Sequence, residues 1–300
     1  MRAAAIFGLG CSPESLKPFQ ESGNVEWHIG LPISRDEADI ILLFGGDGTI
    51  HRYLSPLVKL GLPLLIVPVG SGNDFANALG LGRVRDSLTV WARLCSGNGN
   101  IQSVDLGVIT SPAEASNAAS YAQESAQEAY YYFCSVAGIG LDCEVARRAN
   151  RLPRWLRRHG GYALSLASTV FRFTPFTINI LAQSDNGERL KRSYESTILA
   201  AFANSDAYGG GMRIAPRAKM DDGQLDICVI AGIHPFKLAC LFPTVYFGRH
   251  IAIREVEYFQ ATGVRVETEE PIDVYADGEF VCRTPVEIRV QAAALKLLTP

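Results

Sequence analysis

The chain of 300 residues is nearly half hydrophobic and has a formal net charge of -3 with a pI near 6.0. This length and composition predict two domains with sizeable cores, and the slight acidity excludes a general electrostatic attraction to nucleic acid. No run reaches the roughly 18 apolar residues of a membrane-spanning helix, so the only membrane contact we expect is peripheral.

The seven cysteines are odd in number, scattered along the chain and mostly set among apolar residues. This usage is typical of a cytosolic protein with reduced thiols. The sequence contains no CxxC pair that would indicate a zinc site. The apolar N-terminal stretch is only as long as a strand, so we interpret it as the first strand rather than as a secretion signal. We therefore expect a cytoplasmic protein.

The first predicted elements are a strand over residues 3–9 and a short helix over residues 13–20. Between them, Gly8-Leu9-Gly10-Cys11-Ser12 forms a glycine-bearing turn. A GxG pattern alone is a weak ligand signal, and an ordinary strand-to-helix turn explains it better.

An uninterrupted apolar run over residues 40–44 indicates a buried parallel strand, and it ends in Gly45-Gly46-Asp47-Gly48-Thr49. Glycines at the end of a strand let backbone N–H groups approach phosphate oxygens, and Thr49 can cap the following helix. Taken alone, this motif is equally compatible with a tight β-turn. Apolar spacing predicts a helix from Thr49 to Leu60, which Pro56 should kink or split.

The same pattern then repeats, with a strand over residues 63–69, a glycine turn over residues 70–74 and a short helix over residues 75–79. Glycine turns at the ends of successive strands are how an open α/β sheet holds a nucleotide. Ser71 and Asn73 can donate to phosphate or cap a helix, and the repeated pattern favours the phosphate.

A helix is predicted over residues 84–96 and a strand starts at residues 104–108. After this strand the amino-acid composition changes. Residues 111–128 are rich in Ala, Ser, Gln and Glu, which predicts a surface loop or poorly ordered insertion. A β-rich second domain is predicted beyond it. Its strands are expected at residues 130–136, 177–182, 197–203, 225–230 and 264–268.

Two helical stretches of the second domain bear on lipid contact. Residues 141–173 are arginine-rich, with Leu152, Trp155 and Leu156 interleaved, which fits a solvated helical face or a surface for anionic headgroups. Six of its arginines lie close together, at Arg147, Arg148, Arg151, Arg154, Arg157 and Arg158. The apolar stretch at residues 234–248 fits core packing better than a lipid channel.

Several motifs recur in a characteristic order from about residue 37 to the C-terminus. They are GGDGT at 45–49, VPVGSGNDFANALG at 67–80, VDLG at 104–107, AGIGLD at 137–142, AN at 203–204, GGGM at 209–212, PRAKMDDGQLD at 216–226, DGE at 277–279 and ALKLL at 294–298. In this order and spacing, the chain resembles the diacylglycerol kinase catalytic family, to which sphingosine kinases and bacterial lipid kinases also belong.

The resemblance implies an N-terminal open α/β nucleotide-binding domain, related to those of NAD kinase and phosphofructokinase, and a C-terminal antiparallel β-sandwich. We place the first domain at residues 1–108 and the lipid-substrate domain at residues 109–290, with residues 291–300 returning to the first. The family carries its active site in the cleft between the two domains.

The reaction that the resemblance implies is transfer of the γ-phosphoryl group of ATP to a lipid hydroxyl, with diacylglycerol or a related glycerolipid as the favoured acceptor. The expected nucleotide loops consist of Gly45, Gly46, Gly48, Thr49, Gly70, Ser71, Gly72 and Asn73. Asp47 is expected to act on the polyphosphate through a cation or an ordered water, in a polar network with Asp74 and Asp105.

The resemblance assigns Glu279 as the base that takes the proton of the acceptor hydroxyl, with Asp277 supporting it or binding metal. It also implies a structural Mg²⁺ held by Asp222 and by backbone carbonyls of Lys219 and Gln224. Without the resemblance, DGE at 277–279 would be a hairpin turn and DDG at 221–223 an exposed turn.

The chain departs from the family pattern at three places near the nucleotide loops, one of which is Pro56 in the helix behind GGDGT. The first loop lacks the usual Asn-Pro and basic residue, and His51-Arg52 stands where the family commonly has Asn-Glu. These departures keep open a catalytically weakened lipid-binding or nucleotide-binding regulatory protein of the same fold. NAD kinase and a sphingoid-base kinase rank lower, and exposed sandwich edges are compatible with a homodimer.

Overall fold

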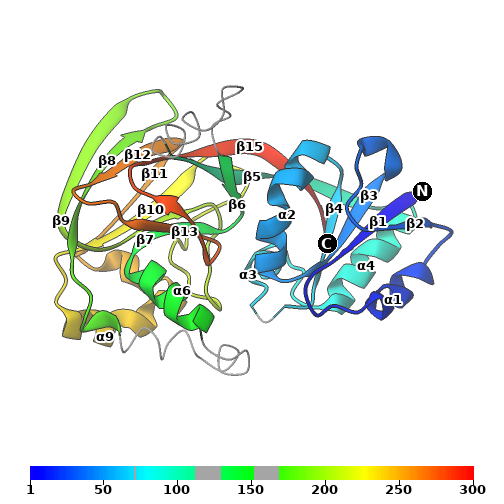
Figure 1. The fold of residues 1–300 in the computed structure, drawn as a ribbon, viewed down its shortest axis with the longest axis horizontal. Helices are drawn as coiled ribbons and strands as arrows, with labels where there is room; N and C mark the ends of the chain where they lie inside the picture. Colours follow the sequence, from blue (N-terminus) through cyan, green and yellow to red (C-terminus); the bar gives the residue numbers. More distant parts are fainter. Residues whose placement is uncertain (71, 112–129, 152–168) are drawn as a thin grey trace, which may run out of the picture. The chain divides into compact units, whose positions relative to one another are not determined.

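The computed structural model describes residues 1–70, 72–111, 130–151 and 169–300 (Figure 1). The chain divides into two compact units, Met1–Leu106 with Ala292–Pro300, and Gly107–Gln291. Most of the predicted loop at 111–128 and the arginine-rich segment beyond residue 151 lie outside the described residues. Among the described residues, no helix is long and apolar enough to cross a membrane.

The first unit is built on a parallel sheet with the strand order β15-β4-β3-β1-β2. Its strands are β1 (Arg2–Phe7), β2 (Glu26–Ile29), β3 (Ile40–Gly45), β4 (Leu64–Pro68) and the end of β15 (Val286–Thr299). Every residue of β3 and β4 is buried, as the uninterrupted apolar runs predict for strands covered on both faces. The last residues of the chain complete this sheet, because Leu297 pairs with Leu64.

Helices cover this sheet and follow its strands along the chain (Figure 1). They are η1 (Pro13–Leu16), α1 (Lys17–Gln20), η2 (Arg35–Glu37), α2 (Asp47–Leu60), α3 (Asp74–Ala78) and α4 (Val84–Cys95). The buried indole of Trp91 on α4 donates from Nε1 to the carbonyl of Phe19 on α1, at 2.8 Å. This hydrogen bond satisfies a polar group that would otherwise be costly to bury.

Two expectations about α2 are wrong, namely that Thr49 caps the helix and that Pro56 splits it. The helix begins at Asp47 with Gly46 as its N-cap residue, so Thr49 lies in the first turn and does not cap it. The helix is also continuous through Pro56. Pro56 is half-buried and the residue four positions earlier, Arg52, is exposed, so water can satisfy the carbonyl that the missing N–H leaves without a helical partner.

The second unit is antiparallel, with the strand order β14-β13-β7-β9-β8-β12-β15. Strand β10 pairs with β9 and β11, and β5 (Asn100–Thr110) pairs with β6 and β15. The strands predicted at residues 177–182, 197–203, 225–230 and 264–268 are confirmed, whereas the one predicted at residues 130–136 is wrong as a single strand, because β6 ends at Phe133 and β7 begins at Val136. Strands β11, β13 and β14 were missed because they are short and leave most of their side chains at least partly exposed. The strands are β6 (Tyr130–Phe133), β7 (Val136–Gly140), β8 (Phe176–Gln183), β9 (Arg189–Ala203), β10 (Leu225–Ala231), β11 (Val256–Ala261), β12 (Gly263–Thr268), β13 (Asp273–Ala276) and β14 (Glu279–Arg283).

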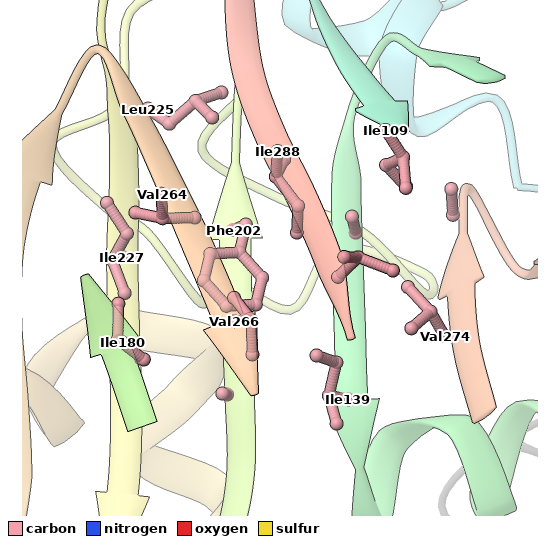
Figure 2. Close-up of a cluster of buried hydrophobic side chains, with 14 of the residues drawn as sticks. Ile109, Ile139, Ile180, Phe202, Leu225, Ile227, Val264, Val266, Val274 and Ile288 are labelled. Carbon is pink, nitrogen blue, oxygen red and sulfur yellow. The ribbon is translucent and has the colours of Figure 1, made fainter. Parts of the chain in front are cut away.

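Strand β9 contributes to two hydrophobic cores, one on each of its faces. Phe202 points into the core shown in Figure 2, with Ile227 and Val266 among its neighbours in the same cluster. The adjacent residues Ala201 and Ala203 belong to the second core, on the other face. Because successive side chains of a strand alternate between faces, a strand buried on both sides reads as a continuous apolar run, as residues 197–203 largely do.

Helical segments cover the second core. They are α6 (Leu141–Arg151), α9 (Pro235–Leu241), η3 (Phe242–Phe247) and η4 (Arg249–Ala252). Leu141 and Val145 of α6 lie in this core, and Leu238 and Leu241 of α9 pack against it. The helical prediction for residues 141–173 is thus confirmed over Leu141–Arg151, and the one for residues 234–248 is confirmed by α9 and η3.

Candidate functional site

The two glycine turns of the first unit meet at one edge of the sheet. Phe44 pairs with Val67 and Gly45 with Pro68, so β3 and β4 end side by side. A Cβ atom added to Gly46 would lie 2.8 Å from the Cα atom of Gly70, and one added to Gly70 would lie 2.5 Å from the Cα atom of Gly46. Only glycine at both positions allows the two backbones to approach this closely.

The turn after β1 contacts the same edge. The N–H of Gly8 donates to the carbonyl of Phe44 at 2.7 Å, and a Cβ atom on Gly8 or on Gly45 would overlap the side chain of Thr49. Thr49 therefore fills the space between the first turn and the GGDGT turn. The weak GxG pattern of residues 8–10 thus belongs to a turn that packs on the second one.

Asp47 and Asn73 hold the loop over residues 70–74 in place. The Asp47 carboxylate accepts hydrogen bonds from the backbone N–H groups of Asp74 and Phe75, each at 3.2 Å. Asn73 adopts a left-handed conformation (φ 57°), and its amide both accepts from the N–H and donates to the carbonyl of Gly70 at 3.0 Å. A carboxylate on the first N–H groups of α3 also complements the positive end of that helix. Ser71 lies outside the described residues.

Asp105 is a buried carboxylate of the first unit. It lies on β5 with 4% exposure, and its Oδ1 accepts a hydrogen bond from the N–H of Ala293 at 2.8 Å. Ala293 has a left-handed backbone (φ 51°), so Asp105 fixes an irregular point of β15.

The Asp-Gly-Glu motif is the turn of the hairpin between β13 and β14. Asp277 and Gly278 both have positive φ angles, 50° and 85°, as a two-residue hairpin turn of type I′ requires. The Asp277 carboxylate accepts hydrogen bonds from three successive backbone N–H groups, those of Cys134 at 2.9 Å, Ser135 at 2.8 Å and Val136 at 3.3 Å. Glu279 follows as an exposed side chain at the start of β14.

Asp222 lies beside Asp226 in a cavity of about 350 Å³ that Lys219 also lines. Oδ1 of Asp222 accepts from the N–H of Gln224 at 3.1 Å. Asp226 is fully buried, and burial raises the pKa of its carboxyl even though the Tyr258 hydroxyl donates to it at 2.6 Å. The described residues contain no group of three or more His, Cys, Asp or Glu side chains suited to a metal, so a cation here would also need backbone carbonyls.

A second cavity, of about 510 Å³, opens in the same unit and was not predicted from the sequence. Phe173, Phe176 and Ile272 give it an apolar wall, and Glu144 and Arg147 of α6 form an ion pair on its lining, with Nε of Arg147 2.9 Å from the carboxylate. Tyr275 of β13 lines the cavity and packs edge-on against Phe280 of β14, with ring centroids 5.8 Å apart. The cavity thus extends to the hairpin that carries Glu279.

Asp142 is a buried carboxylate next to the residues of this cavity, and sequence reasoning gave it no role. Burial raises the pKa of its carboxyl to about 6, although the N–H of Cys143 donates to it at 2.9 Å. A Cβ atom on Gly138 would overlap the Asp142 carboxylate, so the glycine of the AGIGLD motif leaves room for this side chain.

Comparisons with known proteins agree along the chain. Residues 25–109 match the diacylglycerol kinase catalytic domain, and residues 135–299 match the YegS C-terminal NAD kinase beta sandwich-like domain. A diacylglycerol kinase of Mycobacterium tuberculosis (strain ATCC 25618 / H37Rv) is 33% identical over 262 residues, covering 87% of this chain and 77% of that protein. A diacylglycerol kinase of Bacillus subtilis (strain 168) is 25% identical, covering 84% and 74%.

A solved structure supports the fold assignment. The crystal structure of a diacylglycerol kinase from Bacillus anthracis str. Sterne superposes with a TM-score of 0.67 at 18% identity, covering 100% of this chain and 97% of that one. The two matched domains, an N-terminal α/β region and a C-terminal sandwich-like domain, place the chain in the class of lipid kinases. The chain belongs to the diacylglycerol kinase catalytic-domain family with a YegS-type C-terminal domain.

Replacing Gly46 with alanine should destabilise the fold, because the new methyl group would meet the Cα atom of Gly70. We expect a loss of about 1–3 kcal/mol in the free energy of unfolding, typical of overpacking, measured by urea denaturation. Gly23→Ala is the control, since its Cβ atom would make only ordinary contacts with Cys95. Equal stability of the two variants would contradict the close approach of the loops.

Asp142→Asn should stabilise the protein at neutral pH. The folded state raises the pKa of this carboxyl from 3.8 to about 6, so its favourable contribution is complete below pH 3.8 and is lost as the pH rises towards 6. The introduced amide would stay neutral and would still accept the hydrogen bond from the Cys143 N–H. The substitution should therefore raise the free energy of unfolding by up to about 3 kcal/mol at pH 7 and leave it unchanged near pH 3.5. Unfolding curves across this pH range measure the difference, with the exposed Asp36→Asn as control. A gain that is independent of pH would contradict the assignment.

Proposed function

We propose that the chain transfers the γ-phosphoryl group of ATP to the hydroxyl of diacylglycerol or a related glycerolipid. Family membership establishes a lipid kinase, and kinases of this family use ATP. The observation that carries the choice of acceptor is the cavity of about 510 Å³, whose apolar wall continues to Tyr275 beside the Glu279 hairpin. Its size and lining suit the apolar part of a lipid next to a polar head.

We assign the nucleotide to the glycine loops of the first unit. The proposed nucleotide-binding residues are Gly45, Gly46, Gly48, Thr49, Gly70, Ser71, Gly72 and Asn73. Asp47 already holds the N–H groups of Asp74 and Phe75, so we assign it to fixing the shape of these loops and to facing the cation that accompanies the polyphosphate. Asp74 and Asp105 complete the proposed polar surroundings.

We assign the proton transfer to Glu279. Its carboxylate takes the proton of the acceptor hydroxyl while that oxygen forms a bond to the γ-phosphorus, and the bond from phosphorus to the bridging oxygen of ADP breaks. Asp277 supports this step by holding the hairpin, because its three accepted hydrogen bonds fix the turn from which Glu279 projects. In this assignment, Asp277 is a positioning residue.

We assign the cavity around Asp222 to a structural Mg²⁺. The Asp222 carboxylate and the backbone carbonyls of Lys219 and Gln224 would supply only hard oxygen donors, which fit this cation. Asp222 and Lys219 line the cavity. When bound, Mg²⁺ would offset the negative charge of two neighbouring carboxylates, one of them fully buried.

Glu279→Gln should lower turnover by about 100- to 10,000-fold, the range typical for loss of a general base, with little change in ATP affinity. The measurement is transfer of labelled phosphate from ATP to diacylglycerol in mixed micelles, with product identification and a parallel ATP titration by calorimetry. Glu195→Gln, an exposed glutamate on β9, is the matched control.

Unchanged turnover in Glu279→Gln would contradict the assignment of Glu279 as the general base. Wild-type protein that binds ATP but phosphorylates no lipid of a broad panel would refute the kinase assignment and favour the regulatory alternative. NAD is included as an acceptor, since its phosphorylation would instead indicate NAD kinase activity.

Mg²⁺ without nucleotide should stabilise the protein through Asp222. At 100-fold excess over its dissociation constant, a ligand that binds only the folded state adds about 3 kcal/mol. We expect thermal unfolding to shift upward with Mg²⁺ in the wild type and in the exposed control Asp185→Asn, but not in Asp222→Asn. The same Mg²⁺ shift in all three proteins would place the cation elsewhere.

A further inference from the structure

The outer face of α9 and η3 carries an aromatic stripe, defined by Phe236, Cys240, Pro243, Tyr246 and Phe247. Phe236 and Phe247 are 66% and 73% exposed, and the other members are exposed too. The spacing of three to four residues places them along one side of a helical segment. This stripe has no part in the proposed chemistry.

The opposite face of the same segment is already packed. Leu238, Leu241, Phe242 and Val245 belong to the second core of the β-rich unit or pack against it. The segment is therefore apolar on its inner and its outer side. A helical segment of this kind favours an apolar environment on both sides, and burial in the core supplies it on one side only.

The charges around the stripe select an anionic partner. Residues 231–254 contain no Asp or Glu, whereas Lys237, Arg249 and Arg254 are all exposed. Lys237 pairs with Glu255, the first carboxylate after this stretch, at 2.6 Å. A second copy of the chain placed on the stripe by two-fold symmetry would bring these cations towards one another, which disfavours a dimer here. Exposed aromatic rings flanked by cations suit the surface of an anionic bilayer.

The helical segment that carries the stripe and residues 170–173 beside the cavity of about 510 Å³ pack on the same hydrophobic core. Val170 lies in the second core and Phe173 packs against it, as do Leu238 and Leu241 of α9. Phe173 also lines the cavity of about 510 Å³, and Phe171 between them is 62% exposed. Figure 1 shows α6, which lines the cavity, and α9 at the same end of the β-rich unit.

We propose that the aromatic stripe docks the protein on an anionic phospholipid bilayer, with Phe236 and Phe247 inserted at the headgroup boundary and Arg249 contacting lipid phosphates. This proposal rests on the proposed function in one respect, since a glycerolipid acceptor resides in a bilayer. Docking at this surface would place the membrane near residues 170–173, beside the cavity.

The test is partition of the full chain onto sedimented vesicles, of phosphatidylcholine alone or mixed with phosphatidylglycerol. We expect the double variant Phe236→Ser and Phe247→Ser to lose about tenfold or more in partition, because two large apolar groups leave the interface. Arg249→Gln should lower the preference for anionic vesicles by about fivefold, in line with one cation at a charged surface. The matched control is Ile33→Ser with Leu190→Ser, which removes two exposed apolar side chains elsewhere.

A readout independent of the bilayer separates docking from catalysis. Phosphorylation of a soluble short-chain diacylglycerol should be the same in the stripe variant as in the wild type. If the wild type phosphorylates no lipid but still partitions through the stripe, the proposed function fails and docking stands.

Partition of the stripe variant equal to that of the wild type, or no partition of the wild type onto either vesicle, would overturn the docking proposal. A wild-type dimer in light scattering that the stripe variant dissociates, with vesicle binding unchanged, would also overturn it and identify the stripe as a subunit interface.

Discussion

The hydrogen bonds from Asp74 and Phe75 to the Asp47 carboxylate are the contacts on which the glycine loops depend. Asp47 is the first residue of α2, the helix after β3. Its two carboxylate oxygens accept hydrogen bonds from the first residues of α3, the helix after β4. One side chain thereby sets the distance between two turns that are 27 residues apart in sequence. Gly46 and Gly70 also contact each other, which holds the two turns together at this point.

The β-rich unit has the same kind of contact at the turn of the hairpin between β13 and β14. Asp277 accepts hydrogen bonds from three consecutive backbone N–H groups, as Asp47 does from two. In both units, an aspartate of a conspicuous motif accepts backbone hydrogen bonds and so orients the backbone around it. This arrangement explains why an acidic motif residue can be indispensable for the geometry of a site while its own oxygens are already hydrogen-bonded.

The strands that are buried on both faces could be predicted from the sequence. Burial on both faces requires a continuous run of apolar residues, and such a run is visible without knowing which strand pairs with it. The same holds for the class of the fold and for the family, whose motifs are contiguous. The hairpin strands β13 and β14 and the cavity beside Glu144 could not be predicted, since they depend on pairing between distant segments. Asp142 and the N-cap of α2 were missed for a related reason: burial of a polar group and the first helical residue are decided by tertiary contacts.

The return of the last residues to the first sheet has a consequence for how the protein is made. β15 pairs with β4 at Leu297, and Leu295, Leu297 and Leu298 are buried there. During synthesis the first unit must wait for the final residues before its sheet is complete, whereas the strands of the second unit emerge earlier than that segment. Until then β4 presents an unpaired edge, and the nascent α/β unit is open to wrong partners for as long as translation of the remaining chain takes.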